Sequence, residues 1–209
     1  MDLSCFKAYD LRGRVPDQLN PTLAERIGRA YVEVTGAKRV IVGYDIRLSS
    51  RDIADALCSG LMAAGADVFD IGLKMVGPDS RPISSDNGLN DIRDRVLEPF
   101  GDAPEQGRYE PLEVVTAYID HLLGYITTGS LKPKTIVVNA GNGGAGLMID
   151  ELEQHLPFDF IKVHHQADGH FPNGVPNPIL EENRAATADA VLEYGAAMGI
   201  AWDGDYDRC

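Results

Sequence analysis

Cysteine is scarce in this sequence. Its 209 residues include three, Cys5, Cys58 and Cys209, which are odd in number, widely spaced and without a C-x-x-C pair. A disulfide framework needs paired cysteines and a cysteine-based zinc site needs close spacing, so neither is expected. We expect reduced thiols, as in a cytoplasmic protein.

Long apolar runs and an excess of positive charge are also missing. Residues 1–7 lack the apolar core of a signal peptide, and no run approaches membrane-spanning length. Lys and Arg number 19 against 32 Asp and Glu, for a formal net charge of -13, which repels nucleic-acid phosphates. We therefore expect a soluble cytoplasmic protein with no nucleic-acid and no membrane partner. The basic residues gather in two places, as suits a small anionic ligand: Lys7, Arg12 and Arg14, then Arg47 and Arg51.

Short apolar runs alternate with amphipathic stretches of helical length. Spacing of this kind predicts an α/β fold with parallel or mixed sheets sandwiched by helices. Strands are expected at 5–15 (running into a turn), 39–45, 66–72, 135–139, 158–163 and 198–202. Helices are expected at 21–36, 49–65, 111–126, 147–156 and 184–194. A composition break at 101–107 predicts two domains, 1–104 and 105–209.

Three aspartates at alternate positions follow directly on the last apolar run. Asp203, Asp205 and Asp207 are close enough in sequence to repel one another, and a hard divalent cation with oxygen ligands relieves such repulsion. Gly204 lets the loop turn tightly. A solvated acidic tail is the alternative, although a tail does not normally follow directly on a buried strand.

Two kinds of cation loop begin with this spacing. A calcium EF-hand needs glycine at the sixth position, where this chain has Arg208, so an EF-hand is excluded. A magnesium loop that works beside phosphate fits better, because Mg²⁺ combines a few carboxylates with phosphate oxygens and Arg208 can hold a phosphate as well.

A glycine run stands between the strand at 135–139 and the helix that follows it. Residues 141–146 match G-x-G-x-x-G, the dinucleotide-binding pattern, but the next strand ends in His164 and His165 rather than in an acid. A close backbone approach is preferred, with glycine amides used for phosphate or for loop packing. A zinc site at His164, His165 and His170 is disfavoured by their spacing, and the proline-rich loop 168–178 is expected to be architectural.

Five motifs occur in an order that resembles the phosphomannomutase/phosphoglucomutase (α-D-phosphohexomutase) family, and the bacterial phosphomannomutases above all. They are Phe6–Gly13, Gly43–Arg47, Asn139–Gly143, the loop from Phe171 to Pro178, and Asp203–Arg208. The resemblance implies four α/β domains around a cleft, in which a phosphoserine held against Mg²⁺ interconverts hexose 1- and 6-phosphates through a bisphosphate.

The resemblance also implies roles for individual residues. The Mg²⁺ ligands would be Asp203, Asp205 and Asp207; Arg208 would steady phosphoryl oxygens; Tyr9 and Arg12 would lie near the phosphosugar and the reacting groups; and Lys74 would be a proton shuttle.

The sequence departs from the family pattern at one decisive place. The Thr-Ala-Ser-His-Asn-Pro loop of the phosphoserine is absent, and Gly72 runs directly into Leu73 where family members have several dozen residues. The first domain is therefore expected to be incomplete, with uncovered edges and apolar surface, and further family domains are expected beyond Cys209. Three hypotheses remain: an inactive phosphohexomutase fragment, a non-catalytic binding module that keeps the second domain, and a phosphatase-like enzyme with Asp203 as its nucleophile.

Overall fold

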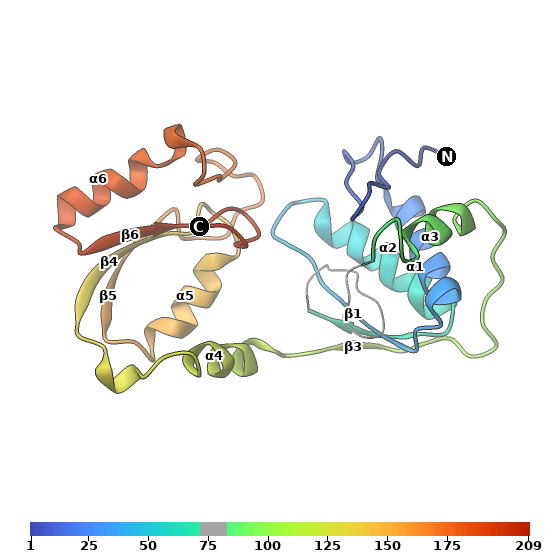
Figure 1. The fold of residues 1–209 in the computed structure, drawn as a ribbon, viewed down its shortest axis with the longest axis horizontal. Helices are drawn as coiled ribbons and strands as arrows, with labels where there is room; N and C mark the ends of the chain where they lie inside the picture. The colour runs from blue at the N-terminus through green and yellow to red at the C-terminus, as the bar shows by residue number, and fades with distance from the viewer. Residues whose placement is uncertain (72–82) are drawn as a thin grey trace. The chain divides into compact units, whose positions relative to one another are not determined.

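The chain divides into two α/β units, each built on a small parallel sheet. The computed structural model describes residues 1–71 and 83–209. By its internal contacts, unit 1 comprises Met1–Tyr44 and Ser49–Leu112, and unit 2 comprises Asp45–Leu48 and Glu113–Cys209 (Figure 1). The α/β fold class expected from the sequence is confirmed. The domain limits 1–104 and 105–209 remain a prediction.

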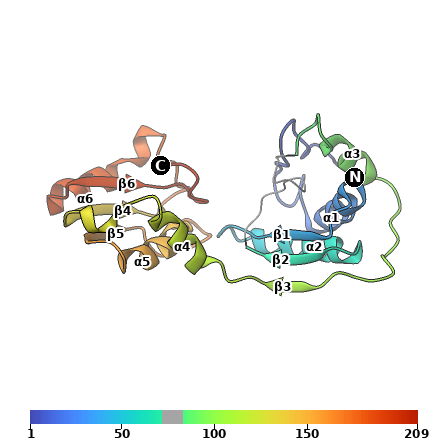
Figure 2. The same ribbon diagram turned by 60° about the horizontal axis from the view of Figure 1, so that its bottom comes forward.

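The sheet of unit 1 has the order β1-β2-β3, and its strands run parallel (Figure 2). They are β1 (Arg39–Val42), β2 (Asp67–Asp70) and β3 (Tyr109–Pro111). Val42 and Val68 are 2% and 0% exposed and belong to the same core as the buried residues of helix α2 (Ser50–Ala63). Helix α1 (Pro21–Thr35) packs on α2, and α3 (Leu89–Arg95) packs on α1.

Helix α1 begins and ends at strong local signals. The side chain of Asn20 accepts a hydrogen bond from the Leu23 amide at 3.0 Å, Pro21 occupies the first turn, and Gly36 ends the helix in the left-handed conformation (φ 68°). Such caps satisfy backbone groups that a helix terminus leaves without partners.

Glycine allows α1 and α2 to cross closely. A Cβ at Gly60 would lie 1.9 Å from the Glu25 carbonyl oxygen, and one at Gly28 would lie 2.5 Å from that of Leu57. Both distances are far inside van der Waals contact, so any larger residue would push the helices apart.

Unit 2 is a three-layer arrangement around the sheet β5-β4-β6. Its strands are β4 (Lys134–Asn139), β5 (Phe158–Val163) and β6 (Met198–Ala201), all parallel. Helix α5 (Ala145–Glu153) lies on one face and α6 (Ala185–Tyr194) on the other, and α4 (Val115–Leu123) packs against α5 (Figure 1). The central strand β4 is buried from Ile136 onward, as expected for a parallel strand covered on both faces.

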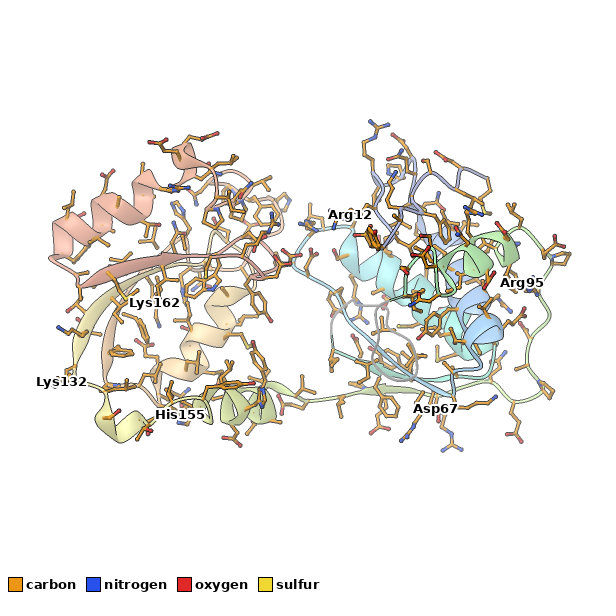
Figure 3. The ribbon with its side chains drawn as sticks, in the orientation of Figure 1. Arg12, Asp67, Arg95, Lys132, His155 and Lys162 are labelled. Carbon is orange, nitrogen blue, oxygen red and sulfur yellow. The ribbon has the colours of Figure 1, made fainter. Side chains whose placement is uncertain are left out.

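An ion-pair cluster ties β5 to α5. The ammonium group of Lys162 lies 2.8 Å from Asp150 Oδ1 and 2.6 Å from Glu153 Oε2 (Figure 3). These contacts raise the pKa of Lys162 and lower that of Asp150, the hydrogen bond between the two being the largest cause in each case.

Several details of the expected secondary structure were wrong or missing. Residues 5–15 form turns with one isolated bridge, Phe6 to Leu11, rather than a strand. The reason is local: the backbone amide of Lys7 donates to the Asp10 carbonyl, so the segment folds on itself instead of pairing with a neighbour. Pro111 ends β3 rather than opening a helix, which begins at Val115. Strand β3 and helix α3 were not predicted. None of the described helices is long and apolar enough to cross a membrane.

Candidate metal-binding site

Three loops meet at the carboxyl edge of the sheet in unit 2. The glycine loop (Gly141–Gly144) follows β4, the proline loop (Phe171–Pro178) lies beyond the end of β5, and the acid loop (Asp203–Arg208) follows β6. Open parallel sheets bind ligands at this edge, because the strand ends diverge there and loops from several strands converge.

The acid loop brings its three carboxylates together. One oxygen from each of Asp203, Asp205 and Asp207 lies within 4.8 Å of the others, and no other such group of three occurs in the part of the chain that the structure describes. Asp203 is buried, at 1% exposed, while Asp205 and Asp207 are exposed. The arrangement agrees with the convergence expected from the alternate spacing.

Hydrogen bonds donated by backbone amides close this loop on itself. The amide of Asp203 donates to the Arg208 carbonyl, the amide of Tyr206 donates to the Asp203 carbonyl, and the amide of Arg208 donates to Asp203 Oδ1, each at 3.2 Å. Tyr206 adopts a left-handed conformation, with φ 49°. The loop is thus a tight turn whose first and last residues, Asp203 and Arg208, are hydrogen-bonded to each other.

The electrostatics of Asp203 fit a cation. Burial, and to a smaller degree the charge of Asp205, raise the pKa of Asp203 above the ordinary aspartate value, against the lowering effect of the Arg208 amide. Its buried Oδ2 forms an ion pair with the Arg208 guanidinium. Three converging carboxylates, one of them buried, suit a hard divalent cation such as Mg²⁺.

Arg208 lies on the same loop as the carboxylates. Its guanidinium contacts Asp203, and its Nε lies 3.2 Å from Asp207 Oδ1. The hydrogen bond to Asp207, together with the charge of Asp203, raises the pKa of Arg208, so the side chain is a permanent cation. It remains 49% exposed and is therefore accessible to an anion.

The other expected site residues lie elsewhere in the chain. Tyr9 and Arg12 belong to the N-terminal segment of unit 1, where Tyr9 is 75% exposed and Arg12 Nε lies 2.6 Å from Asp10 Oδ2 (Figure 3). Lys74 lies outside the described residues. The structure thus brings Asp203, Asp205, Asp207 and Arg208 together within unit 2, and the roles of all seven residues stay predictions.

The glycine loop is used for loop packing. The amide of Gly144 donates to the Gly204 carbonyl at 3.2 Å, and a Cβ at Gly143 would lie 2.7 Å from the same oxygen. The close approach anticipated from the glycine run therefore occurs against the acid loop. The nearby histidines bind separate carboxylates: His165 Nε2 lies 2.8 Å from Asp150 Oδ1, and His170 Nδ1 lies 2.9 Å from Asp168 Oδ1.

Comparison with known proteins identifies the family. Models of the phosphoglucomutase/phosphomannomutase family match residues 4–83 (alpha/beta/alpha domain I) and residues 116–209 (alpha/beta/alpha domain II). The chain belongs to the phosphoglucomutase/phosphomannomutase family.

Individual relatives agree with this assignment. The chain is 48% identical over 243 residues to a protein named phosphohexose mutases from Xanthomonas campestris pv. campestris (strain B100), with 100% of this chain and 54% of that protein covered. It is 44% identical over 249 residues to a phosphomannomutase of Escherichia coli, with 99% of this chain and 55% of the relative covered. The crystal structure of a family protein from Burkholderia thailandensis superposes with a TM-score of 0.83 at 29% identity, covering 98% of this chain and 53% of the other.

Two facts about length accompany the match. The chain spans about half the length of the curated relatives it matches, at 54% for the Xanthomonas protein. That alignment runs over 243 positions although this chain has 209 residues, so at least 34 positions (243 less 209) of the relative have no counterpart here.

Proposed function

We propose that this chain carries the magnesium-binding half of a phosphohexose mutase site, at which hexose 1- and 6-phosphates such as those of mannose are interconverted. The observation that supports this most directly is the convergence of Asp203, Asp205 and Asp207 at the end of a parallel strand, in a chain of this family. The names of the relatives support the substrate class.

The residues of this chain would act by position and charge. Asp203, Asp205 and Asp207 hold Mg²⁺, which supplies positive charge to a transferring phosphoryl group. The exposed guanidinium of Arg208 steadies phosphoryl oxygens with hydrogen bonds of fixed geometry. From unit 1, Tyr9 and Arg12 contact the phosphosugar and Lys74 moves a proton; these three assignments rest on the resemblance of their motifs.

The chain lacks the group that should donate the phosphoryl. No Thr-Ala-Ser-His-Asn-Pro segment occurs in its sequence. Phosphoryl transfer depends on a carrier held in line with the acceptor, and a charged site without that carrier has nothing to transfer. We infer that the chain binds Mg²⁺ without turning over hexose phosphates.

Two measurements on one preparation test this proposal. Titration with Mg²⁺ by isothermal calorimetry should show a single site in the wild type, and Asp203→Asn should weaken it at least tenfold, since a buried anionic ligand is lost. Asp189→Asn, on the exposed side of α6, is the matched control and should bind as the wild type does.

The second measurement is turnover. Mannose 6-phosphate with a hexose bisphosphate activator should give no mannose 1-phosphate above the blank. Robust turnover would refute the inferred inactivity, and absent Mg²⁺ binding would refute the magnesium site.

A non-catalytic binding module is the second candidate, favoured by the absent serine loop. Mg²⁺-dependent binding of mannose 6-phosphate without turnover would identify such a module. A phosphatase with Asp203 as nucleophile gains no support from the geometry, because that carboxylate is buried and paired with Arg208.

A further inference from the structure

One asparagine in the glycine loop connects the loops at the carboxyl edge of unit 2. Asn142 is 6% exposed and adopts the left-handed conformation, with φ 58°. Asparagine tolerates this conformation better than other residues with a side chain. Asn142 lies within the Asn139–Gly143 motif, but no role at the site was expected for it.

Four hydrogen bonds hold Asn142 in place. Its amide donates to the His164 carbonyl at 2.7 Å, and its carbonyl accepts from the Asp168 amide at 2.9 Å. Its side-chain nitrogen donates to the Gln166 carbonyl at 2.8 Å, and its side-chain oxygen accepts from Asn173 Nδ2 at 2.9 Å. The backbone and side chain of one buried residue thus join the glycine loop to the segment after β5 and to the proline loop.

The next two residues, Gly143 and Gly144, contact the acid loop directly. A Cβ at Gly143 would lie 2.7 Å from the Gly204 carbonyl oxygen and 2.9 Å from its Cα. A Cβ at Gly144 would lie 2.8 Å from the ring of Tyr206. The amide of Gly144 donates to the Gly204 carbonyl at 3.2 Å. The backbone of the acid loop therefore rests directly on the backbone of the glycine loop, with no side chain between them.

The proline loop closes on the same place. Gly204 lies against the ring of Phe171, since an added Cβ would be 3.2 Å from Phe171 Cζ, and Gly141 lies against Pro176. Gly204, which separates Asp203 from Asp205, is held between the glycine loop and the proline loop.

We propose that Asn142 and Gly143 are positioning residues for the acid loop: they fix the backbone of Gly204, and through it the convergence of Asp203 and Asp205. The inference deepens the proposed function, and its relevance to Mg²⁺ rests on that function. The physical reason is preorganisation, because carboxylates that are already held together lose little conformational freedom when a cation binds, and groups beyond the ligands commonly change metal affinity 10- to 100-fold.

Gly143→Ala is the sharpest perturbation that the chain offers. Gly143 is not in a left-handed conformation, so alanine is tolerated by its backbone, and the added methyl must displace Gly204. Gly129→Ala is the matched control: its backbone is likewise not left-handed, and an added Cβ meets nothing within 4 Å. Asn142→Gly is the second variant, since glycine keeps the left-handed conformation while it removes both side-chain hydrogen bonds.

The experiment has one readout that needs no metal. Hydrogen exchange of the 209-residue chain is followed by NMR without divalent cations. It measures the exchange rates of the amides of Asp203, Tyr206 and Gly144, each of which donates a hydrogen bond to a carbonyl of the acid loop. In Gly143→Ala and in Asn142→Gly these amides should exchange about tenfold faster or more, whereas amides of β4 should not change. Gly129→Ala should match the wild type at all of them.

The second readout is cation affinity of the folded protein. Tb³⁺ emission excited through the single tryptophan, Trp202, next to Asp203, and its displacement by Mg²⁺, should reveal affinities about tenfold lower in both variants. Unchanged exchange at all three amides in both variants would overturn the proposal, whatever the affinities. If the two variants exchange faster but the wild-type protein binds neither Tb³⁺ nor Mg²⁺, the positioning role is supported and the magnesium site is refuted.

Discussion

The crossing of α1 and α2 leads to a prediction about the stability of unit 1. In Gly60→Ala the new methyl carbon would start 1.9 Å from the Glu25 carbonyl oxygen. A carbon and an oxygen need about 3.2 Å, so the helices must separate by roughly 1 Å. The atom in the way belongs to the backbone and cannot rotate aside, which distinguishes this site from an overpacked cavity among side chains.

The magnitude follows from two opposing effects. Overpacking of this kind costs about 3 kcal/mol, the upper end of the usual range, because separation also loosens contacts among Leu23, Ile27, Leu57 and Leu61. Alanine recovers about 1 kcal/mol of helix propensity relative to glycine. The net loss of about 2 kcal/mol should lower the urea midpoint by roughly 1 M, for a slope of about 1.5–2 kcal/mol per M.

The assay is urea unfolding followed by far-ultraviolet circular dichroism. Ser59→Ala, the neighbouring exposed position of α2, is the control, and it should leave the midpoint within a few tenths of a molar unit. A Gly60→Ala chain that is as stable as the control would refute the close crossing of α1 and α2.

Two further predictions concern buried groups. Burial raises the pKa of Cys58 to about 11, and Cys5 is buried as well. At pH 8 a thiol reagent should therefore modify only the exposed Cys209 quickly, and it should modify all three thiols after denaturation. Fast labelling of two or more thiols in the folded chain would contradict this. Asn139→Ala should destabilise unit 2 by about 1–3 kcal/mol in thermal or urea unfolding, because it removes the bonds to Thr187 Oγ1 (3.0 Å) and from the Gly141 amide (2.9 Å); Asn90→Ala, an exposed position of α3, should cost far less.

The elements that the sequence predicted well are those with strong local patterns. The strands β4 and β5 appear as continuous apolar or alternating runs, and α1 has both of its caps in the sequence. Strand β3, with the sequence Tyr-Glu-Pro, has no such pattern, and it becomes a strand through pairing with β2 at the edge of the sheet. Helix α3 has seven residues, of which two are buried, and is too short to show a helical period.

The same distinction applies to the site. The convergence of Asp203, Asp205 and Asp207 could be predicted because they are alternate residues of one short loop that turns at Gly204. Asn142 could not, because its side-chain partners are residues 24 and 31 positions further along the chain. An asparagine within a glycine run after a strand was the available signal, and it becomes informative only with the partner loops in place.

The pairing of β4 with β6 has a consequence for how the acid loop is encoded. Asn139 pairs with Ala201, and the Trp202 amide donates to the Asn139 carbonyl at 3.0 Å, which ends the ladder one residue before Asp203. Successive side chains of a strand point to opposite faces, so a slip of one residue would turn the buried carboxylate toward solvent and put Gly204 in its place. Deletion of Trp202, the one residue between Ala201 and Asp203, would therefore dismantle the loop, although all three aspartates would still be present in the sequence.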